Sequence, residues 1–280
     1  MRCRHTQFRC LPPFFALLIA VASSTAFVGP SHAWTVPDLP KADRPCAPIP
    51  DAADVRFSQE EWQQLDAGEI IVRVIPGEEG SDHRHVEAVG FLDAHPIWLF
   101  DLGTDSGLVT DLVDIIESSK VLEARSDGKV IHNVADVSAF VPAFEYTLEA
   151  AYLPDRTGQC WAQIEGDFRR NEGSHSFLWD PVRGRTLAVF TFDLGLKGVL
   201  RLIPDRLILK LSGRTLPGYM RQLEAEAHRM EKVDPDRAAA VAALWADLEP
   251  RLRSGELPSR VWPDRRLPSI SAAHNPTVIP

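Results

Sequence analysis

The sequence has no excess of basic residues. Its 280 residues include 30 Lys and Arg against 39 Asp and Glu, which gives a formal charge of −9. Residues 1–33 contain three of the arginines and no acidic residue, so residues 34–280 carry a charge of −12. Affinity for nucleic acid and for anionic bilayers depends on clustered Lys and Arg. We therefore predict no nucleic-acid partner.

Catalytic motifs are lacking as well. The sequence contains neither a Gly-x-Ser-x-Gly elbow nor a glycine-rich phosphate loop. Ser174, His175 and Asp180 have the residue types of a hydrolase triad, but they crowd into one strand-like segment. A nucleophile and its base must instead meet in space, with a third group behind the base. We predict no catalytic residue.

Metal ligands at a metal-binding spacing are also missing. His83 and His85, next to Asp82, would point to one side of a strand. No third ligand follows at a suitable spacing, so a solvated turn explains these residues better than a metal site. We predict neither a metal nor another cofactor.

Apolar runs are too short to span a membrane, since a spanning helix needs roughly 20 apolar residues. The run at 14–22 follows three arginines and precedes Ser31-His32-Ala33. Small residues at positions −3 and −1 of a cut after Ala33 are typical of a secretory signal. We predict a signal peptide over 1–33, cleaved after Ala33, and a secreted or periplasmic protein. An uncleaved anchor is the alternative.

Cysteines are few. Cys3 and Cys10 fall within the predicted signal peptide, which leaves Cys46 and Cys160. This is an even pair in a compartment where disulfides persist. Because connectivity cannot be derived from spacing, a Cys46–Cys160 disulfide and two buried free thiols are both consistent with the sequence.

The order of predicted elements indicates an α+β protein. Five prolines between residues 34 and 57 indicate an extended arm. Ser58 and Glu61 form a capping box for a short helix, and Pro96 begins the first of two further short helices. Apolar alternation between turn residues predicts strands at 69–75, 85–92, 115–125, 129–137, 144–153, 160–168, 174–179 and 186–194.

The connections and the C-terminal part indicate how these strands are arranged. Short links imply antiparallel neighbours, and Asp127-Gly128 is a strong hairpin signal. An apolar stripe from Leu216 to Met230 predicts a long helix with Pro217 in its first turn. Residues 233–280 are predicted to form a further helix and a Pro-rich tail. A helix laid across a curved antiparallel sheet closes a core.

Five segments resemble the START-type helix-grip superfamily of polyketide cyclases, lipid-transfer domains and ubiquinone-binding proteins. They are Gly68–Arg73, Val89–Pro96 with Phe100 and Asp105, Ser118–Glu123, Arg185–Phe190 and Tyr219–Met230. The chain departs from the pattern at His95, where members more often have proline, and in the long stretch 199–215. The resemblance implies a helix-grip (START/Bet v 1-like) fold over residues 58–232, with a curved antiparallel sheet wrapped around a long C-terminal helix.

The resemblance also implies a function. It predicts an exported protein that binds or transfers a lipid, sterol or quinone in an internal cavity, with transient contact to a membrane or to a donor or acceptor protein. The alternative is a cyclase or aromatase on the same scaffold, with Tyr146, His132 or His175 as acid or base. A third interpretation is a filled core with protein binding through the Pro-rich arms.

The candidate cavity residues are large apolar side chains on the predicted concave face and on the closing helix. Alternation along residues 144–152 places Phe144, Tyr146 and Leu148 on one face. The full predicted set is Phe144, Tyr146, Leu148, Trp161, Trp179, Phe190, Phe192, Leu216, Tyr219, Met220 and Leu223. A filled core is the alternative for each of them. Arg201 and Asp205 are candidates for holding a polar head group.

Overall fold

The computed structural model describes residues 47–76, 83–113, 115–136, 143–195, 197 and 205–263. These residues belong to one compact unit. The predicted signal peptide, Cys46, Asp82, Arg201 and the tail after residue 263 lie outside the described residues.

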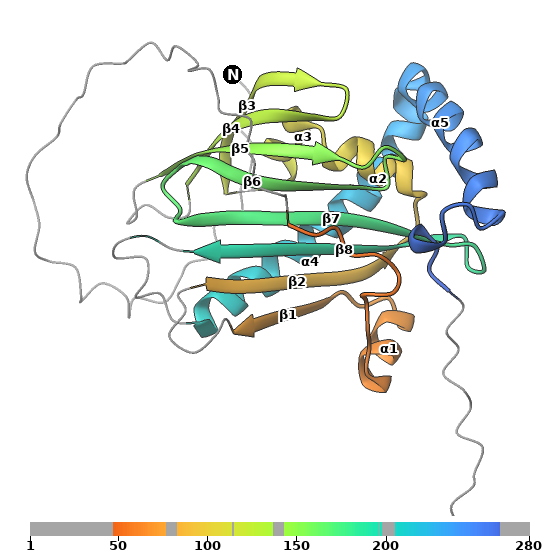
Figure 1. The fold of residues 1–280 in the computed structure, drawn as a ribbon, viewed down its shortest axis with the longest axis horizontal. Helices are drawn as coiled ribbons and strands as arrows, with labels where there is room; N and C mark the ends of the chain where they lie inside the picture. The colour runs from red at the N-terminus through yellow and green to blue at the C-terminus, as the bar shows by residue number, and fades with distance from the viewer. Residues whose placement is uncertain are drawn as a thin grey trace, which may run out of the picture. The chain divides into compact units, whose positions relative to one another are not determined.

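Eight antiparallel strands form one curved, open sheet (Figure 1). In spatial order they are β1 (Ile71–Pro76), β2 (His83–Leu92), β8 (Arg185–Gly195), β7 (Arg170–Asp180), β6 (Gly158–Gly166), β5 (Phe144–Tyr152), β4 (Gly128–Ala135) and β3 (Ile116–Arg125). Strands β3 to β8 pair in chain order, and β2 pairs with the last of them. The chain therefore crosses from β2 to the opposite edge of the sheet before it forms β3.

Five α-helices accompany the sheet in the described residues. They are α1 (Gln59–Asp66), α2 (Pro96–Gly103), α3 (Ser106–Leu112), α4 (Asp205–Val233) and α5 (Pro235–Arg253). Helix α4 crosses behind the strands in Figure 1 and contacts β1, β2 and α2. A curved antiparallel sheet around a long C-terminal helix is the predicted helix-grip fold, and the structure confirms it.

Local signals at two element ends are confirmed. The Glu61 N–H donates to Ser58 Oγ (3.2 Å), and the Ser58 N–H donates to the Glu61 carboxylate (2.8 Å), so the capping box begins α1. Pro96 lies in the first turn of α2. Both signals were reliable because each involves residues within one turn of the chain.

The predicted start of the long helix is wrong. Helix α4 begins at Asp205 rather than at Leu216, and Pro217 lies inside it. An internal proline removes one backbone hydrogen bond from a helix. The apolar stripe that follows is deeply buried, with Met220 and Leu223 fully covered, and this packing outweighs one missing bond.

The predicted start of the strand at 174 is also wrong. Strand β7 begins at Arg170, so the turn expected at 171–173 is part of the strand. The reason is Gly173, where a side-chain Cβ would lie 2.4 Å from the Trp161 ring. Here glycine provides room for an aromatic ring on the neighbouring strand instead of forming a turn.

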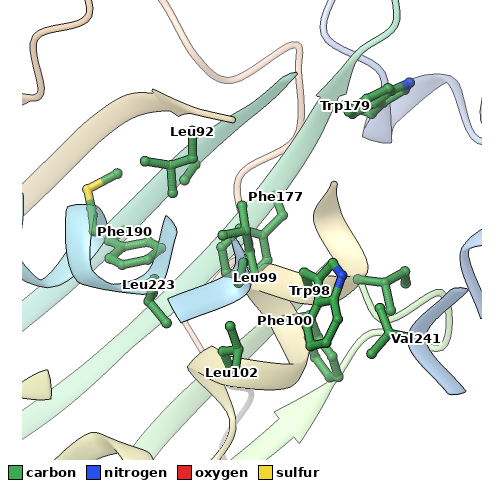
Figure 2. Packing of buried hydrophobic residues seen from close by; sticks show 14 of the residues in the cluster. Leu92, Trp98, Leu99, Phe100, Leu102, Phe177, Trp179, Phe190, Leu223 and Val241 are labelled. Carbon is green, nitrogen blue, oxygen red and sulfur yellow. The ribbon is translucent and has the colours of Figure 1, made fainter. Parts of the chain in front are cut away.

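The core between the sheet and its helices is solid around β2, β7 and β8 (Figure 2). Leu92, Phe177 and Phe190 of the sheet pack there with Leu99 of α2 and Leu223 of α4. All five side chains are fully buried. A second cluster covers the opposite, convex face of the same strands, so this half of the sheet is enclosed on both sides.

Candidate ligand-binding site

A cavity of about 300 Å³ lies between the concave face of the sheet and helices α3 and α4. Strands β4 to β8 supply its floor, and residues such as Val109 of α3 and Leu216 of α4 supply the opposite wall. Most of the lining is apolar. The cavity thus occupies the half of the concave face that the solid core leaves unfilled.

Seven of the predicted residues line this cavity. They are Phe144, Tyr146, Leu148, Trp161, Phe192, Leu216 and Tyr219. The other four, Trp179, Phe190, Met220 and Leu223, belong to the solid core and are not among the lining residues. Apolar periodicity identifies the face that a side chain occupies, but not whether a void or another side chain lies opposite. The ligand-binding role of the seven stays a prediction.

Alternation along β5 determines which side chains face the cavity. Phe144, Tyr146, Leu148 and Ala150 all line it. Tyr152, the next residue of this face, instead packs edge-on against a ring of α2, with its centroid 5.2 Å from that of Phe100. The strand therefore runs from the cavity into the solid core.

A buried lysine lies at one end of the cavity, beside the corner between α2 and α3. Lys129 of β4 lines the cavity and is only 7 % exposed. Its Nζ donates to the Thr104 carbonyl and to Ser106 Oγ (2.6 Å). Burial lowers the pKa of Lys129 to about 8, although the nearby carboxylate of Asp105 acts in the opposite direction. At neutral pH the side chain still carries its positive charge.

Gln159 and His175 lie next to the same corner. Gln159 Nε2 donates to the Gly103 carbonyl (3.2 Å) and lies 3.1 Å from His175 Nδ1. The atom beside a carbonyl oxygen must be the amide nitrogen, which can only donate. His175 therefore accepts at Nδ1 and carries its ring proton on Nε2. We call Lys129, Gln159 and His175 the polar end of the cavity.

His175 is neutral and incompletely hydrogen-bonded. Burial lowers its pKa to about 3. Its Nε2 has no hydrogen-bond partner among the described residues. The ring stacks on Phe190, with centroids 3.9 Å apart, and meets Trp161 edge-on. Packing therefore fixes the ring while one buried N–H remains unsatisfied.

Two tyrosines of the lining are also changed by burial. Burial raises the pKa of Tyr146 to about 12 and raises the pKa of Tyr219 as well. Both phenols keep their protons at neutral pH, so they can donate hydrogen bonds but do not act as bases.

Other residues considered from the sequence lie apart from the cavity. Ser174 donates to the Pro48 carbonyl (3.3 Å) and contacts Thr191 Oγ1 (2.7 Å), on the face opposite to His175. His132 contacts Thr147 Oγ1 (3.2 Å) and alternates with the cavity-lining residues of β4. The triad residue types are thus divided between the two faces of the sheet.

Neither a metal cluster nor a membrane-spanning helix is found in the residues that the structure describes. They contain no group of three or more His, Cys, Asp and Glu side chains that could hold a metal ion. None of the helices in this part of the chain is both long enough and apolar enough to cross a bilayer.

Cys160 of β6 is disulfide-bonded. Cys46 lies outside the described residues, but Pro48, two residues later, contacts the strand next to Cys160. The Pro48 carbonyl accepts a hydrogen bond from Ser174, which is the register partner of Cys160 on β7. This placement supports the Cys46–Cys160 disulfide, which stays a prediction.

Comparisons with known proteins found similar solved structures only. No family model matches the chain, and no curated protein matches it. Protein TTHA0849 from Thermus thermophilus is 21% identical, with a TM-score of 0.47, over 53% of this chain and 99% of that one. The Zhui aromatase/cyclase from a Streptomyces species is 18% identical, with a TM-score of 0.46, over 54% and 97%. A STAR-related lipid transfer protein from Xanthomonas axonopodis is 16% identical, with a TM-score of 0.47, over 57% and 93%.

Proposed function

We propose that the protein binds a hydrophobic small molecule of the lipid, sterol or quinone class in the cavity and carries or sequesters it. The observation that carries this proposal is the cavity of about 300 Å³ with its largely apolar lining. Protein interiors are close-packed, and voids much larger than a water molecule are few. Small-molecule pockets begin at about this size.

The energetics of such a cavity suit binding. Removing apolar surface from water contributes roughly 25 cal/mol per Å². A ligand that fills the cavity would gain this stabilisation along the Phe144, Leu148 and Leu216 walls without any chemical step.

The three residues named for the cyclase alternative are poorly suited to acid–base chemistry. An effective general base has a pKa near the working pH. His175 has a pKa of about 3, and Tyr146 has a pKa of about 12. His132, the third candidate of the cyclase alternative, alternates with the residues that line the cavity. The cyclase alternative therefore receives no support from these three residues.

Native mass spectrometry of the gently purified chain tests this proposal. We expect a mass above that of the polypeptide, which disappears after extraction with organic solvent and returns when an apolar ligand is added. A chain that carries no extractable molecule and takes up no lipid, sterol or quinone would contradict the proposal.

We also propose that the protein is exported after cleavage behind Ala33. The disulfide of Cys160 supports this proposal because disulfides persist in oxidising compartments. The N-terminal sequence and the non-reduced mass of the protein from its native host test it. A mature N-terminus at Trp34 with Cys46 and Cys160 oxidised is expected, whereas an intact N-terminus or free thiols at both positions would refute it.

A further inference from the structure

We propose that the polar end of the cavity recognises an anionic oxygen group on the ligand, of which a carboxylate on an apolar chain is the simplest case. This inference rests on the proposed ligand-binding function. It names the chemistry of the head group, and it predicts that the ligand lies with its head next to the α2–α3 corner.

The first step of the argument is the charge of Lys129. Buried charges are normally paired with a group of opposite sign. Among the described residues, no carboxylate forms an ion pair with Lys129, whose Nζ bonds to one carbonyl and one hydroxyl. An ammonium has three N–H donors, so one donor is left over at the wall of the cavity.

The nearby acidic residue is already occupied. The Oδ2 of Asp105 accepts a bond from Arg237 (3.0 Å), and its Oδ1 accepts the N–H groups of Gly107 and Leu108. Asp105 therefore stabilises the buried charge of Lys129 through Coulomb attraction, without a hydrogen bond to it. Lys129 therefore has no directly bonded carboxylate among the described residues.

The second step is the unsatisfied donor of His175. The side chain is only 5 % exposed, and Gln159 fixes its proton on Nε2, which has no hydrogen-bond partner in the described structure. A buried donor without an acceptor destabilises the folded protein. An oxygen of the ligand would remove this destabilisation, whereas an apolar group would not.

Lys129 and Gln159, the residue that orients His175, contact adjacent residues at the α2–α3 corner. Gln159, which orients His175, bonds the carbonyl of Gly103, and Lys129 bonds the carbonyl of the next residue, Thr104. Both sets of contacts are therefore anchored on successive peptide units, and Lys129, Gln159 and His175 all line the same cavity. An anionic oxygen held here satisfies a charge and a donor at once, while the apolar body of the ligand lies along β5.

Binding of dodecanoic acid and of dodecanol, measured by isothermal titration calorimetry at neutral pH, tests this inference. The two probes share one chain and differ in the charge of the head group. We expect the wild-type protein to bind the acid about tenfold more tightly than the alcohol, the effect of one hydrogen bond to a charged group. Lys129→Met should lower the affinity for the acid far more than the affinity for the alcohol.

Two further variants make the result decisive. Lys120 is exposed on β3 and is not among the lining residues, so Lys120→Met is the matched control and should keep the wild-type preference. His175→Leu should also reduce the preference, and it provides the test if Lys129→Met fails to fold. Equal affinity of the wild type for both probes would overturn this inference but not the proposed function. An unchanged preference for the acid in both Lys129→Met and His175→Leu would do the same. Binding of neither probe would count against the proposed function itself.

Discussion

Individual buried polar residues make the stability of this protein depend on pH. Lys129 has a folded-state pKa of about 8 against an ordinary value of 10.5. Between these pH values the unfolded chain binds a proton that the folded chain does not, so the folding penalty of Lys129 is full below pH 8 and decreases as the pH rises. His175 follows the same rule in acid, since its pKa is lowered from 6.5 to about 3.

His175→Leu is expected to make the fold less sensitive to acid. Below pH 6.5 the unfolded chain takes up a proton that buried His175 refuses, so wild-type stability falls as the pH decreases toward 3. Between about pH 7 and about pH 4.5 this effect amounts to about 2 kcal/mol. Urea denaturation at these two pH values measures the free energy of unfolding. Its decrease from about pH 7 to about pH 4.5 should be smaller in the variant than in the wild type by this amount.

The exposed histidine of α4, His228, provides the control for this measurement. His228→Leu should lose stability in acid as the wild type does. The account of His175 fails if the two variants respond to acid equally.

Gly173→Ala is expected to destabilise the fold by about 2 kcal/mol through overpacking. The new Cβ would lie 2.4 Å from the Trp161 ring and 2.3 Å from the Thr191 carbonyl oxygen. At Gly218 of α4 an added Cβ would have no atom within 4 Å, so Gly218→Ala should raise stability by up to about 1 kcal/mol. Thermal unfolding of both variants checks this, and a neutral Gly173→Ala would contradict the packing explanation.

The apolar part of the site could be predicted at the residue scale, but its polar end could not. Strict alternation identified Phe144, Tyr146 and Leu148, because a strand places every second side chain on one face. Lys129 and Gln159 were missed, because their burial depends on the carbonyls of Gly103 and Thr104, far away in the sequence. The signal that was available is that Lys129 shares the face of Ile131 on β4.

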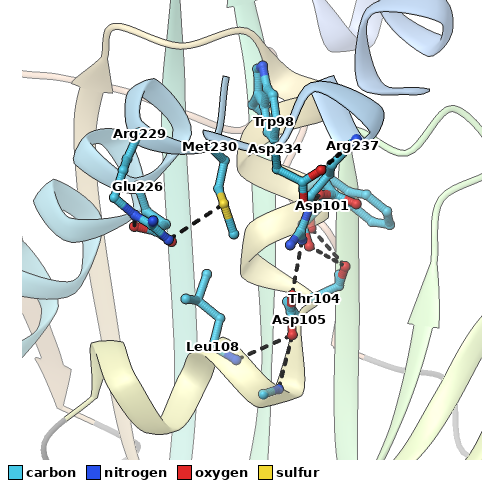
Figure 3. Close-up of polar contacts among 12 residues, drawn as sticks. Trp98, Asp101, Thr104, Asp105, Leu108, Glu226, Arg229, Met230, Asp234 and Arg237 are labelled. Carbon is cyan, nitrogen blue, oxygen red and sulfur yellow. Dashed lines mark hydrogen bonds and ion pairs between the residues drawn. The ribbon is translucent and has the colours of Figure 1, made fainter. Parts of the chain in front are cut away.

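At the scale of elements, one arginine joins α5 to the cavity wall (Figure 3). Arg237 of α5 donates to Asp101 of α2 (2.6 Å) and to Asp105 (3.0 Å), which in turn caps α3. Helix α3 is followed by lining residue Val113. The position of α5 is therefore coupled to one side of the cavity through a few polar contacts.

Arg237→Met is expected to loosen this junction. The ion pairs are partly exposed, so the loss of stability should be about 1 kcal/mol. Hydrogen exchange should become faster in α3 and in the first turns of α5. Arg253→Met, which removes an exposed pair with Glu249 on the same helix, is the control. Unchanged exchange in α3 would show that Arg237 does not hold it.

The types and order of the elements followed from the sequence because their signals are local. The Ser58–Glu61 box and the Asp127-Gly128 turn act over a few residues. The boundaries of α4 and β7 did not follow, since Pro217 and Gly173 are tolerated for tertiary reasons. A proline or a glycine in a helix or strand pattern marks the end of that element only where tertiary packing does not offset its local cost.

At the scale of the whole described unit, the first and last described segments of the chain lie over the convex face of the sheet. Arg260 is 5 % exposed and donates to Thr157 Oγ1 (2.8 Å), to Ser176 Oγ (2.7 Å) and to the Pro50 carbonyl (3.1 Å). Arg260 thus links the segment around Pro50 to Thr157, which precedes β6, and to Ser176 of β7. These contacts enclose the sheet from the side opposite to the cavity.

Arg260→Met is expected to destabilise the protein by roughly 3 kcal/mol, because buried carbonyl and hydroxyl groups lose their partner. Urea denaturation measures this loss. Arg251→Met removes a more exposed ion pair with Glu256 and should leave stability close to that of the wild type. Similar values for the two variants would show that the arm is not held by Arg260.

The central claim is that the concave face encloses a binding cavity, and a pair of variants on β5 tests it most directly. Ala150 is 3 % exposed and lines the cavity, whereas Ala151 next to it is exposed on the other face. The measurement is a fluorescence titration with the apolar dye N-phenylnaphthylamine. We predict equal affinity for the wild type and Ala151→Phe, and an affinity reduced more than about tenfold in Ala150→Phe. Binding that Ala150→Phe leaves unchanged would contradict a ligand site in this cavity.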